Sequence, residues 1–261
     1  MAAEFSGLSV LVTGAASGFG AETARQLAAQ GARLVISDLN ADGLESVRAG
    51  LAAGGVECRA LAGDVAEPRL SHDLVAEAVA AFGRLDIAIN NAGIAHPQGR
   101  IPQIDEATAR KVVAVDLLGV FWALQAQLPQ MEAQYRATGR GGAIVNTASV
   151  AGLVGAPTLS IYAAAKHGVV GLTRTAATEY ARRGIRVNAV CPSFARTPMA
   201  EDPLRDAPDR AEAEAQLVRG VPMRRLAEVG EVVQAILWAA SPANSFMTGQ
   251  ALAIDGGITA Y

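Results

Sequence analysis

A chain of 261 residues, 51% of them apolar, is long enough to bury one sizeable hydrophobic core, and α/β folds of this length often form a single domain. The net charge of −3 and the scattered arginines argue against a nucleic-acid binder, and two cysteines far apart in sequence argue against a disulfide scaffold. The N-terminal residues M-A-A-E-F-S-G do not resemble a secretory signal, and no run of about 18 apolar residues is free of charges or turn signals. We therefore expect a cytoplasmic protein that binds neither nucleic acid nor a membrane.

Short apolar runs alternate with longer amphipathic stretches along the chain. Strands are expected at 10–12, 34–36, 59–61, 86–89, 143–146, 186–190 and 251–254, and helices at 21–29, 42–53, 69–82, 107–133, 162–182 and 231–240. Repeated strand–helix alternation favours a parallel sheet covered on both faces, and right-handed crossovers make such a sheet doubly wound. The expected fold is therefore α/β, with one doubly wound Rossmann-type domain spanning residues 1–261.

Residues 198–222 interrupt this alternation. Pro198, Pro203, Pro208 and Pro222 surround the charged run D-R-A-E-A-E, between an expected strand and an expected helix. A proline-rich segment in this place is typical of a mobile flap with a short helix of its own, and we expect it to cover the substrate.

The first strand–helix junction carries the sequence T-G-A-A-S-G-F-G, with glycines at positions 14, 18 and 20. Glycine lets the backbone turn tightly and approach a pyrophosphate, and the free N–H groups of the following helix attract the anion. The spacing G-x-x-x-G-x-G differs from the commoner G-x-G-x-x-G and also occurs in ordinary glycine-rich turns. Its position at the first strand–helix junction favours a dinucleotide site.

The second expected strand ends at Asp38, about 20 residues beyond the glycine loop. A carboxylate there can accept hydrogen bonds from the ribose hydroxyls of the adenosine and would repel a 2′-phosphate, so we expect NAD rather than NADP. A helix N-cap is the alternative role for Asp38. Arg33 keeps NADP open, although it stands at the beginning of the strand.

Lys111 and Lys166 are the two lysines among 22 basic residues, and Lys166 follows Tyr162 by four positions on an expected helix. Residues four apart lie on one helix face. A free phenol, with a pKa of about 10, is a poor base at neutral pH, but a nearby ammonium stabilises its anion. Ser149 ends an expected strand, where ligands of open α/β sheets gather, and its hydroxyl could hold a substrate oxygen or simply cap a turn.

In these residues the chain resembles the short-chain dehydrogenase/reductases. The similarity extends over nearly the whole sequence. It rests on T-G-A-A-S-G-F-G at 13–20, G-D-V at 63–65, N-N-A-G at 90–93, Ser149, Y-A-A-A-K at 162–166, C-P-S-F-A-R-T-P at 191–198 and T-G-Q-A-L-A-I-D-G-G at 248–257. Seven motifs in the same order indicate an oxidoreductase that moves a hydride between a nicotinamide and a carbinol carbon.

The resemblance implies a role for individual residues. Tyr162 would be the general acid/base, Lys166 would tune it and bind the nicotinamide ribose, and Ser149 would hydrogen-bond the substrate oxygen. Together with Tyr162 and Lys166, the cofactor would contact Gly14, Ser17, Gly18, Phe19, Gly20, Asp38, Leu39, Asp64, Val65, Asn90, Ala92, Gly93, Pro192 and Thr197.

Two residues depart from the pattern of the family. Asp116 stands where relatives have an asparagine whose backbone carbonyl holds a water linked to the lysine. The carbonyl role survives the change, while the carboxylate could attract Lys166, so Asp116 is kept as a site residue. Ser193 replaces a common glycine and would be strained if that position needs a positive φ.

The substrate would lie against His96, Leu159, Phe194 and Met199 besides Ser149 and Tyr162, by the same resemblance. Positions near the pocket in relatives are mostly apolar here, which favours an uncharged, fairly hydrophobic secondary alcohol or its ketone, cyclic or aryl-bearing: Val150, Ala151, Leu153, Leu159, Phe194 and Met199. Arg205, Arg210 and Arg219 of the flap leave an alternative open, an NADP-dependent reductase of the same family acting on a 3-oxoacyl thioester or a polyol or sugar. His96 is equally compatible with a solvated loop, and a non-catalytic NAD-binding redox sensor is the alternative from another class.

No metal is expected, because the three histidines have no short metal-binding spacing. Relatives commonly form tetramers through the two long helices and the C-terminal strand, so we expect a homotetramer. The small residues of the 162–182 helix suit close helix contact, either between subunits or inside the subunit: Ala163, Ala164, Gly168 and Gly171.

Overall fold

The computed structural model describes residues 4–260 and contains a seven-stranded, fully parallel sheet in the order β3-β2-β1-β4-β5-β6-β7. Its strands are β1 Ser9–Thr13, β2 Arg33–Asp38, β3 Cys58–Ala62, β4 Ile87–Asn90, β5 Gly142–Thr147, β6 Ile185–Pro192 and β7 Ala251–Ile254. The chain reverses its direction of progress across the sheet between β1 and β4. Ligands of doubly wound sheets bind outside the carboxyl ends of the strands at such a reversal, which is where the glycine loop follows β1.

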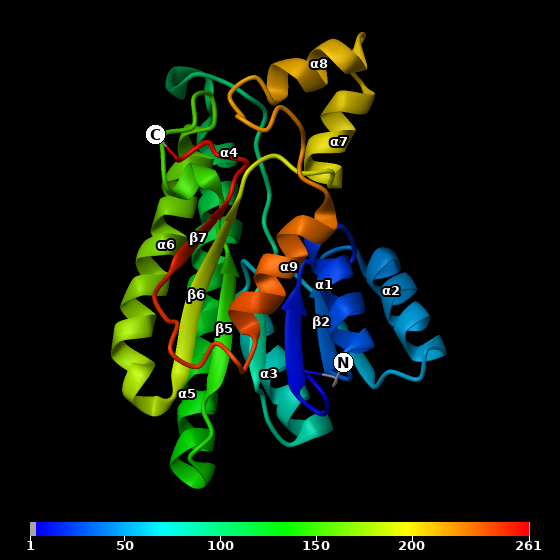
Figure 1. Cartoon of the computed structure of the whole chain (residues 1–261), viewed down its shortest axis with the longest axis vertical. Helices are drawn as coiled ribbons and strands as arrows, with labels where there is room; N and C mark the ends of the chain where they lie inside the picture. The colour runs from blue at the N-terminus through cyan, green and yellow to red at the C-terminus, as the bar shows by residue number, and fades with distance from the viewer. Residues whose placement is uncertain (1–3, 261) are drawn as a thin grey trace.

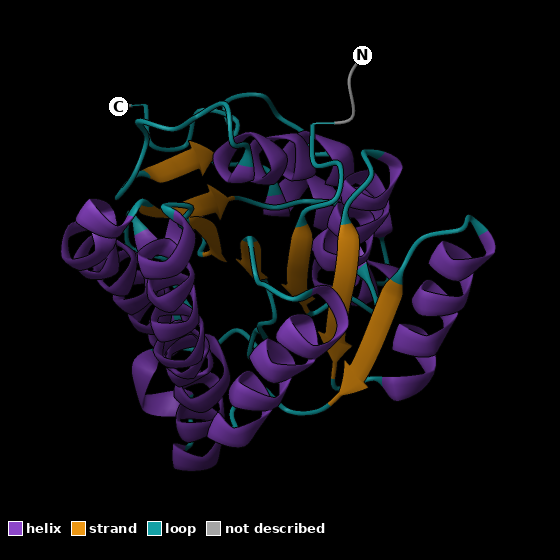
Figure 2. Ribbon diagram, turned by 90° about the horizontal axis from the view of Figure 1, so that it is seen from below, coloured by secondary structure: helices purple, strands orange, loops and turns teal. Residues whose placement is uncertain are grey.

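Helices cover both faces of the sheet, as Figures 1 and 2 show. One face buries the apolar sides of α1 Gly18–Ala29, α2 Ala41–Ala53 and α9 Val229–Ala240, and the other buries those of α3 Pro68–Phe82, α5 Gly119–Thr138 and α6 Ser160–Tyr180. The two apolar cores lie on opposite sides of nearly continuous hydrophobic strands, which is the pattern of a sheet buried on both faces. The expected α/β doubly wound fold is confirmed, with the expected strands and helices differing at their ends by a few residues.

Local sequence signals explain where these helices begin and end. Pro68 occupies the first turn of α3, where its missing N–H costs no helical hydrogen bond, and Gly83 ends the helix in the left-handed conformation with a φ of 78°. Asn40 caps α2 by accepting a hydrogen bond from the Gly43 amide. The ends of α2 and α3 are therefore set by capping and helix-ending residues that can be recognised in the sequence.

The long helix expected at 107–133 is continuous but not uniform. It consists of α4 Glu106–Val113, a π-helical turn at Ala114–Leu118 and α5, and the wider turn contains Asp116. Single π-turns inside α-helices occur mostly at functional sites. The helix Glu106–Thr138 is long and apolar enough by composition to cross a membrane, but 56% of its most apolar window is buried within the protein, as in the core helices of soluble proteins that pass the same test.

The flap at 198–222 holds two short helices rather than the one expected, α7 Pro198–Arg205 and α8 Arg210–Leu217. They stand beyond the carboxyl ends of the strands (Figure 1) and enclose a small apolar core. Arg196, which precedes the flap, forms ion pairs with Glu201 of α7 (3.2 Å), Glu214 of α8 (2.8 Å) and Glu228 before α9 (3.2 Å). One side chain therefore ties both flap helices to the body of the domain.

Candidate active site

The glycine loop at the end of β1 has the geometry of an anion cradle. Gly14 and Gly18 have φ values of 66° and 51°, which L side chains rarely adopt, and a Cβ on Gly20 would lie 2.0 Å from the Gly14 carbonyl oxygen. Ser17, at the N-cap of α1, makes no side-chain capping bond, and the first turn of the helix has no acidic residue. The N–H groups and positive dipole end of α1 are thus left for an anion, and these residues fit the pyrophosphate of a dinucleotide.

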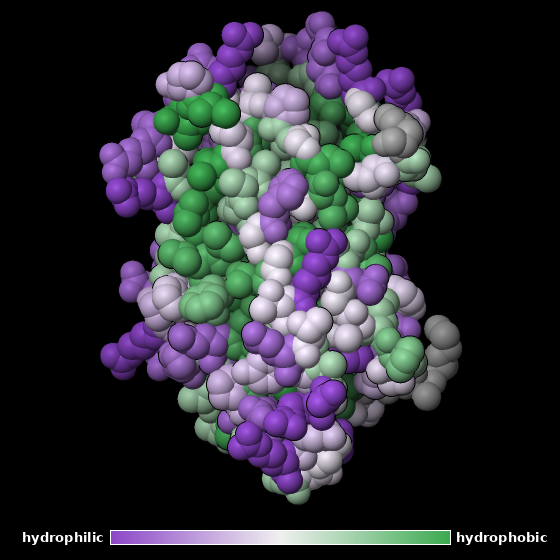
Figure 3. Space-filling view, turned by 90° about the vertical axis from the view of Figure 1, so that its left-hand side faces the viewer, coloured by the Kyte–Doolittle hydropathy of each residue, from purple (hydrophilic) through white to green (hydrophobic). Residues whose placement is uncertain are grey.

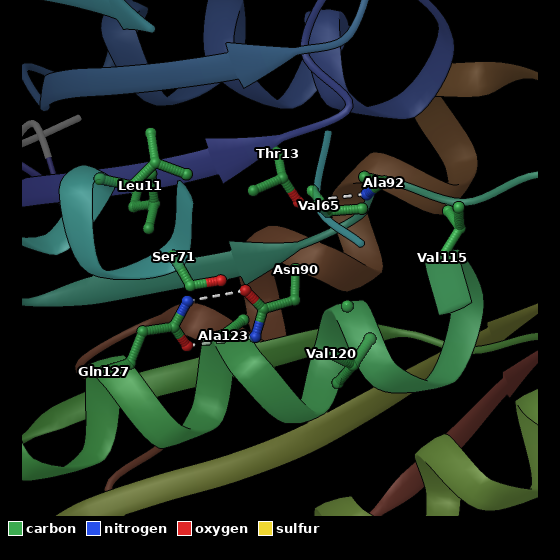
Figure 4. A pocket seen from close by; sticks show the side chains of 12 residues that line it. Leu11, Thr13, Val65, Ser71, Asn90, Ala92, Val115, Val120, Ala123 and Gln127 are labelled. Carbon is green, nitrogen blue, oxygen red and sulfur yellow. Dashed lines mark hydrogen bonds between the residues drawn. The ribbon is translucent and has the colours of Figure 1, made fainter. Parts of the chain in front are cut away.

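The glycine loop is fastened to β4 by Asn91, which the sequence did not single out. The Asn91 side-chain amide donates to the carbonyl oxygens of Thr13 (3.1 Å) and Gly14 (3.3 Å). In return, the Thr13 hydroxyl oxygen accepts hydrogen bonds from the backbone amides of Asn91 and Ala92, both at 3.1 Å. Figure 4 shows the bond from Ala92. The motif N-N-A-G indicated that an asparagine lies near the glycine loop, but the sequence alone does not show which of the two asparagines contacts it.

The side chain of Asn90 lies in a buried polar network instead. It exchanges hydrogen bonds with Gln127 of α5 (2.8 and 3.1 Å) and donates to Asn146 of β5 (2.9 Å), which in turn donates to Thr173 of α6 (2.9 Å). Figure 4 shows Asn90 turned toward Gln127. Successive strand residues point to opposite faces, so Asn90 ties the sheet to α5 and α6 while Asn91 faces the loop. We therefore expect Asn90 to support the cofactor groove from below rather than by direct contact.

The residues predicted for the adenosine half lie along the ends of β2, β3 and β4. Asp38 ends β2, and its carboxylate accepts hydrogen bonds from the backbone amides of Ala16 and Asn40, both at 2.9 Å. Asp64 similarly accepts from the Ala66 amide (2.9 Å). The exposed Leu39 follows Asp38, whereas Arg33 lies at the opposite end of β2 and donates to the Gly7 carbonyl oxygen (2.9 Å). Asp38 thus fixes the glycine loop and stands at the ribose end of the strand, away from Arg33.

A small cavity adjoins this half of the groove (Figure 4). Val65 and Ala92, both predicted to contact the cofactor, line it together with Val115 of the π-turn, which the sequence did not single out. The close approach of the chain here depends on Gly119, because a Cβ at that position would lie 3.1 Å from a Val65 methyl carbon.

The catalytic candidates meet at the first turns of α6. Tyr162 and Lys166 share a helix face, and the Lys166 ammonium nitrogen lies 5.5 Å from the centroid of the Tyr162 ring. Lys166 is only 3% exposed and donates a hydrogen bond to the Thr147 carbonyl oxygen at the end of β5 (3.1 Å). The ammonium is thus buried and held by the Thr147 carbonyl oxygen, close to the Tyr162 ring. In this position it can stabilise the Tyr162 phenolate, and we expect it to bind the nicotinamide ribose.

Asp116 joins this pair from the π-turn. One carboxylate oxygen accepts a hydrogen bond from the Ile94 amide (2.8 Å), and the other lies 3.5 Å from the Lys166 ammonium nitrogen. Burial raises the pKa of Asp116, and Lys166 and the Ile94 amide offset part of that rise. Burial by itself lowers the pKa of Lys166, but attraction to Asp116 and Tyr162 outweighs it, so that this pKa lies above its usual range.

Ser149 lies just beyond the carboxyl end of β5 and is 8% exposed. Its hydroxyl oxygen accepts a hydrogen bond from the Ala151 amide (3.1 Å), and the hydroxyl faces the Pro192 carbonyl oxygen at 3.5 Å. Ser149 therefore caps a turn and also stands at the sheet edge where the substrate is expected. The turn cap is observed, and the hydrogen bond to the substrate oxygen stays a prediction.

The flap and two loops bring the remaining candidates to the same edge. Thr197 precedes α7 and lies against the glycine loop, since a Cβ on Gly18 would be 3.4 Å from its side chain. Gly93 lies close to the catalytic lysine, because a Cβ at that position would be 3.2 Å from the Lys166 nitrogen. Met199 is 48% exposed on α7, while Phe194 packs against the small flap core. These placements put the chain segments at 93, 166 and 197 around one groove.

Leu159 directly precedes α6, and His96 is buried on the loop after β4, where its Nδ1 donates to the Pro97 carbonyl oxygen (2.8 Å). Because a carbonyl oxygen only accepts, the proton stands on Nδ1. His96 is therefore buried, and the interpretation of this residue as a solvated loop histidine is wrong. Ser193, after Pro192, is not strained, because Thr158 and Arg224 are the non-glycine residues with positive φ in the described chain.

Metal-binding residues do not gather in this groove. Among residues 4–260, no group of three or more histidines, cysteines, aspartates or glutamates is arranged to hold a metal ion. The polar groups that the groove offers are a phenol, an ammonium and a hydroxyl, which suits proton transfer beside a bound dinucleotide.

Comparisons with known proteins agree with this arrangement. A family model described as enoyl-(acyl carrier protein) reductase matches residues 14–259. The chain is 43% identical to cis-4-hydroxycyclohexanecarboxylate dehydrogenase of Sinomonas cyclohexanicum over 96% of each chain, and 39% identical to cyclohexanol dehydrogenase of Acinetobacter sp. (strain SE19) over 99% of this chain and 98% of that one. The crystal structure of levodione reductase superposes with a TM-score of 0.92 at 38% identity, covering 98% of this chain and 99% of the other.

The match thus spans the sheet, the glycine loop, the tyrosine–lysine pair and the flap, at identities well above those that show a fold alone. Relatives of this similarity are named as dehydrogenases and a reductase. The chain belongs to the short-chain dehydrogenase/reductase family.

Proposed function

We propose that this protein is an NAD-dependent dehydrogenase that interconverts a cyclic, uncharged secondary alcohol and its ketone. The observation that carries the reaction is the buried Lys166 ammonium, which lies 5.5 Å from the Tyr162 ring centroid and donates to the Thr147 carbonyl oxygen at the end of β5. We further propose that it works in the cytoplasm, where NAD is available, with a small molecule as its partner.

In this mechanism each side chain has a distinct task. Ser149 holds the substrate oxygen by a hydrogen bond, and the Tyr162 hydroxyl takes the alcohol proton during oxidation or returns it during reduction. Lys166 stabilises the phenolate and is held in place by the Thr147 carbonyl oxygen. NAD, when bound, supplies or accepts the hydride at its nicotinamide ring.

The preference for NAD rests on Asp38. Its carboxylate stands at the end of β2 with no basic side chain bonded to it among the described residues, and it holds the Ala16 amide of the glycine loop. A 2′-phosphate would meet this negative charge, whereas ribose hydroxyls can donate to it. Both carboxylate oxygens retain a free lone pair for such a bond.

Two features support an uncharged substrate: several residues predicted to contact it are apolar, and two arginines of the flap are already engaged in ion pairs. Leu159, Phe194 and Met199 are apolar, and Arg205 and Arg210 of the flap are already paired with Asp202 and Glu201. Cyclic substrates are favoured because two similar enzymes are named for cyclohexane derivatives. One of them is named for a carboxylate, so charge is the property to test.

Steady-state kinetics with matched alcohols tests this proposal. We expect kcat/KM for cyclohexanol to exceed that for an open-chain secondary alcohol, and that for cis-4-hydroxycyclohexanecarboxylate, by at least about tenfold, since each lost apolar contact or unpaired charge costs roughly 1–3 kcal/mol. The methyl ester of this carboxylate has the same ring with an uncharged substituent, so it is the control that separates the effect of charge from the effect of size. A preference for the anionic substrate would contradict the uncharged class, and the absence of NADH formation with every alcohol would favour a redox sensor.

We also propose a homotetramer. Figure 3 shows an apolar band on the side of the molecule where α5 and α6 lie, and Leu118 and Phe121 of this region are 38% and 39% exposed. Trp238 of α9 and Phe246 are further large apolar side chains that are exposed. Exposed apolar side chains outside the α5–α6 side suit a second isologous interface, as a tetramer needs.

The small-residue face expected to form one interface is divided by the fold. Ala164 and Gly171 are exposed, but Ala163 is buried and a Cβ on Gly168 would lie 2.7 Å from Leu117 of the same chain. Gly168 therefore serves contact within the subunit. For Ala163 and Gly168, contact inside the subunit, one of the two alternatives, is what the structure shows.

Phe121→Glu is expected to split the tetramer into dimers, because a carboxylate in an apolar interface is left unpaired. Light scattering measures the mass of the wild type and the variant. Glu106→Gln, on the exposed surface of α4, is the control and should leave the mass unchanged. A wild-type protein that is monomeric would contradict the proposal.

A further inference from the structure

Asp116 places a carboxyl group beside the catalytic lysine. The side chain is completely buried, and one oxygen is satisfied by the Ile94 amide at 2.8 Å. The other oxygen lies 3.5 Å from the Lys166 nitrogen and accepts no hydrogen bond from residues 4–260. The geometry is that of an ion pair without a good hydrogen bond, so its main effect on Lys166 is electrostatic.

An amide of the same shape would keep the Ile94 hydrogen bond and remove the charge. Asparagine presents a carbonyl oxygen to an amide donor just as aspartate does, but its other terminal group is a neutral NH₂. The carboxylate therefore adds nothing to the shape of the π-turn that an asparagine lacks. What it changes is the charge around Lys166.

Few other ionisable groups act on the Lys166 ammonium. Tyr162 lies on the same helix, Asp116 comes from the π-turn, and the Cys191 thiol comes from β6. Burial raises the pKa of Cys191 to about 11, which keeps it a neutral thiol at ordinary pH. Asp116 is thus the carboxyl group among them, and its oxygen 3.5 Å from the ammonium nitrogen forms an ion pair with Lys166.

We propose that Asp116 is a positioning residue that sets the pH at which Tyr162 exchanges its proton, by offsetting the positive charge of Lys166. Lys166 favours the phenolate and the carboxylate opposes it, so the two contributions partly cancel. Alcohol oxidation needs the phenolate as base, and ketone reduction needs the phenol as acid. Asp116 therefore shifts the balance toward the phenol, the form that ketone reduction needs.

The sign of the effect follows from the charge. Removing the carboxylate takes away one of the attractions that raise the pKa of Lys166, but the Thr147 carbonyl oxygen and Tyr162 still favour the ammonium. The ammonium is then unopposed, which favours the phenolate and moves the half-maximal pH of alcohol oxidation downward. We expect Asp116→Asn to lower this pH by about one unit, the smaller end of what a nearby opposite charge produces. For ketone reduction the same change should make activity fall at a lower pH than in the wild type.

The experiment compares pH profiles of kcat/KM for cyclohexanol oxidation and cyclohexanone reduction in the wild type, Asp116→Asn and Glu106→Gln. The Glu106 variant removes one negative charge from the exposed surface of the neighbouring helix and should reproduce the wild-type profile. Asp116→Ser, which is also neutral, should shift the profile in the same direction if Asp116→Asn does not fold. A shift of less than about 0.3 unit, or a shift toward higher pH, in a folded neutral variant overturns the proposal.

This inference rests on the proposed function, and a second measurement separates the two. Tyrosinate absorbs in the ultraviolet, so the difference in absorbance between the NAD-bound protein and its Tyr162→Phe variant reports the ionisation of Tyr162 without turnover. Titrated this way, Asp116→Asn should ionise Tyr162 about one pH unit below the wild type. If no alcohol is oxidised but this shift is found, the proposed substrate fails and the role of Asp116 stands; if the titrations coincide, the role of Asp116 fails.

Discussion

Tyr162→Phe lowers kcat for alcohol oxidation by about 10²–10⁴-fold, the contribution of a positioned general acid or base. The substitution removes the hydroxyl that exchanges the proton and leaves the ring that packs beside Lys166. NAD affinity should stay within about threefold, because the glycine loop, Asp38 and Lys166 are untouched. NADH absorbance measures the rate, and quenching of protein fluorescence on cofactor binding measures the affinity.

Tyr180→Phe is the matched control, since Tyr180 is the last residue of the same helix and lies about five turns away from Tyr162. It should retain wild-type turnover. Turnover kept by Tyr162→Phe would show that another group exchanges the proton. Loss of both turnover and cofactor affinity would show instead that the ring supports the groove, which the catalytic role alone does not predict.

Asp38→Asn raises the ratio of kcat/KM with NADP to that with NAD by about 100-fold. The carboxylate is the negative charge that a 2′-phosphate would meet, and juxtaposed like charges cost several kcal/mol. Asparagine keeps one oxygen to accept a backbone hydrogen bond from Ala16 or Asn40, so the glycine loop retains part of its support. Part of the change should appear as weaker NAD use, because an amide binds the ribose hydroxyls less strongly than a carboxylate.

Initial rates with each cofactor at a fixed alcohol concentration measure this ratio. Asp42→Asn, in the first turn of α2, removes a charge from the nearby surface and serves as the control. It should change the ratio by less than about threefold, since a more distant exposed charge is largely screened by salt. A wild type that already prefers NADP, or an Asp38→Asn variant with the wild-type ratio, would contradict the role given to Asp38.

The side chains of the neighbouring residues Asn90 and Asn91 have different partners, which the sequence did not reveal. The motif N-N-A-G indicated an asparagine at the cofactor groove, and the sequence pointed to the first of the two. In the structure the first belongs to a buried network with Gln127 and Asn146, and the second holds the glycine loop. The direction of a strand-end side chain depends on where the strand register places it, which sequence letters alone do not give.

The flap shows the same limit. Its prolines and charges marked residues 198–222 as separate from the sheet, which the structure confirms. The number of helices and the ties made by Arg196 to Glu201, Glu214 and Glu228 were not predictable, because these residues are 5 to 32 positions apart and meet through folding. Charged residues at such separations carry no periodic signal.

By itself the sequence determined the doubly wound fold and the spacing that brings Tyr162 and Lys166 together, and it predicted where the cofactor binds. These follow from local rules, namely hydrophobic periodicity, glycines where the backbone must turn or approach closely, and four-residue spacing on one helix face. Only the tertiary structure decided that the Asp116 carboxylate reaches Lys166 at 3.5 Å, that Asn91 rather than Asn90 holds the loop, and that Gly168 packs within its own subunit. Each of these is a contact between segments distant in sequence, and its geometry is fixed by how helices and strands pack rather than by the residues' own preferences.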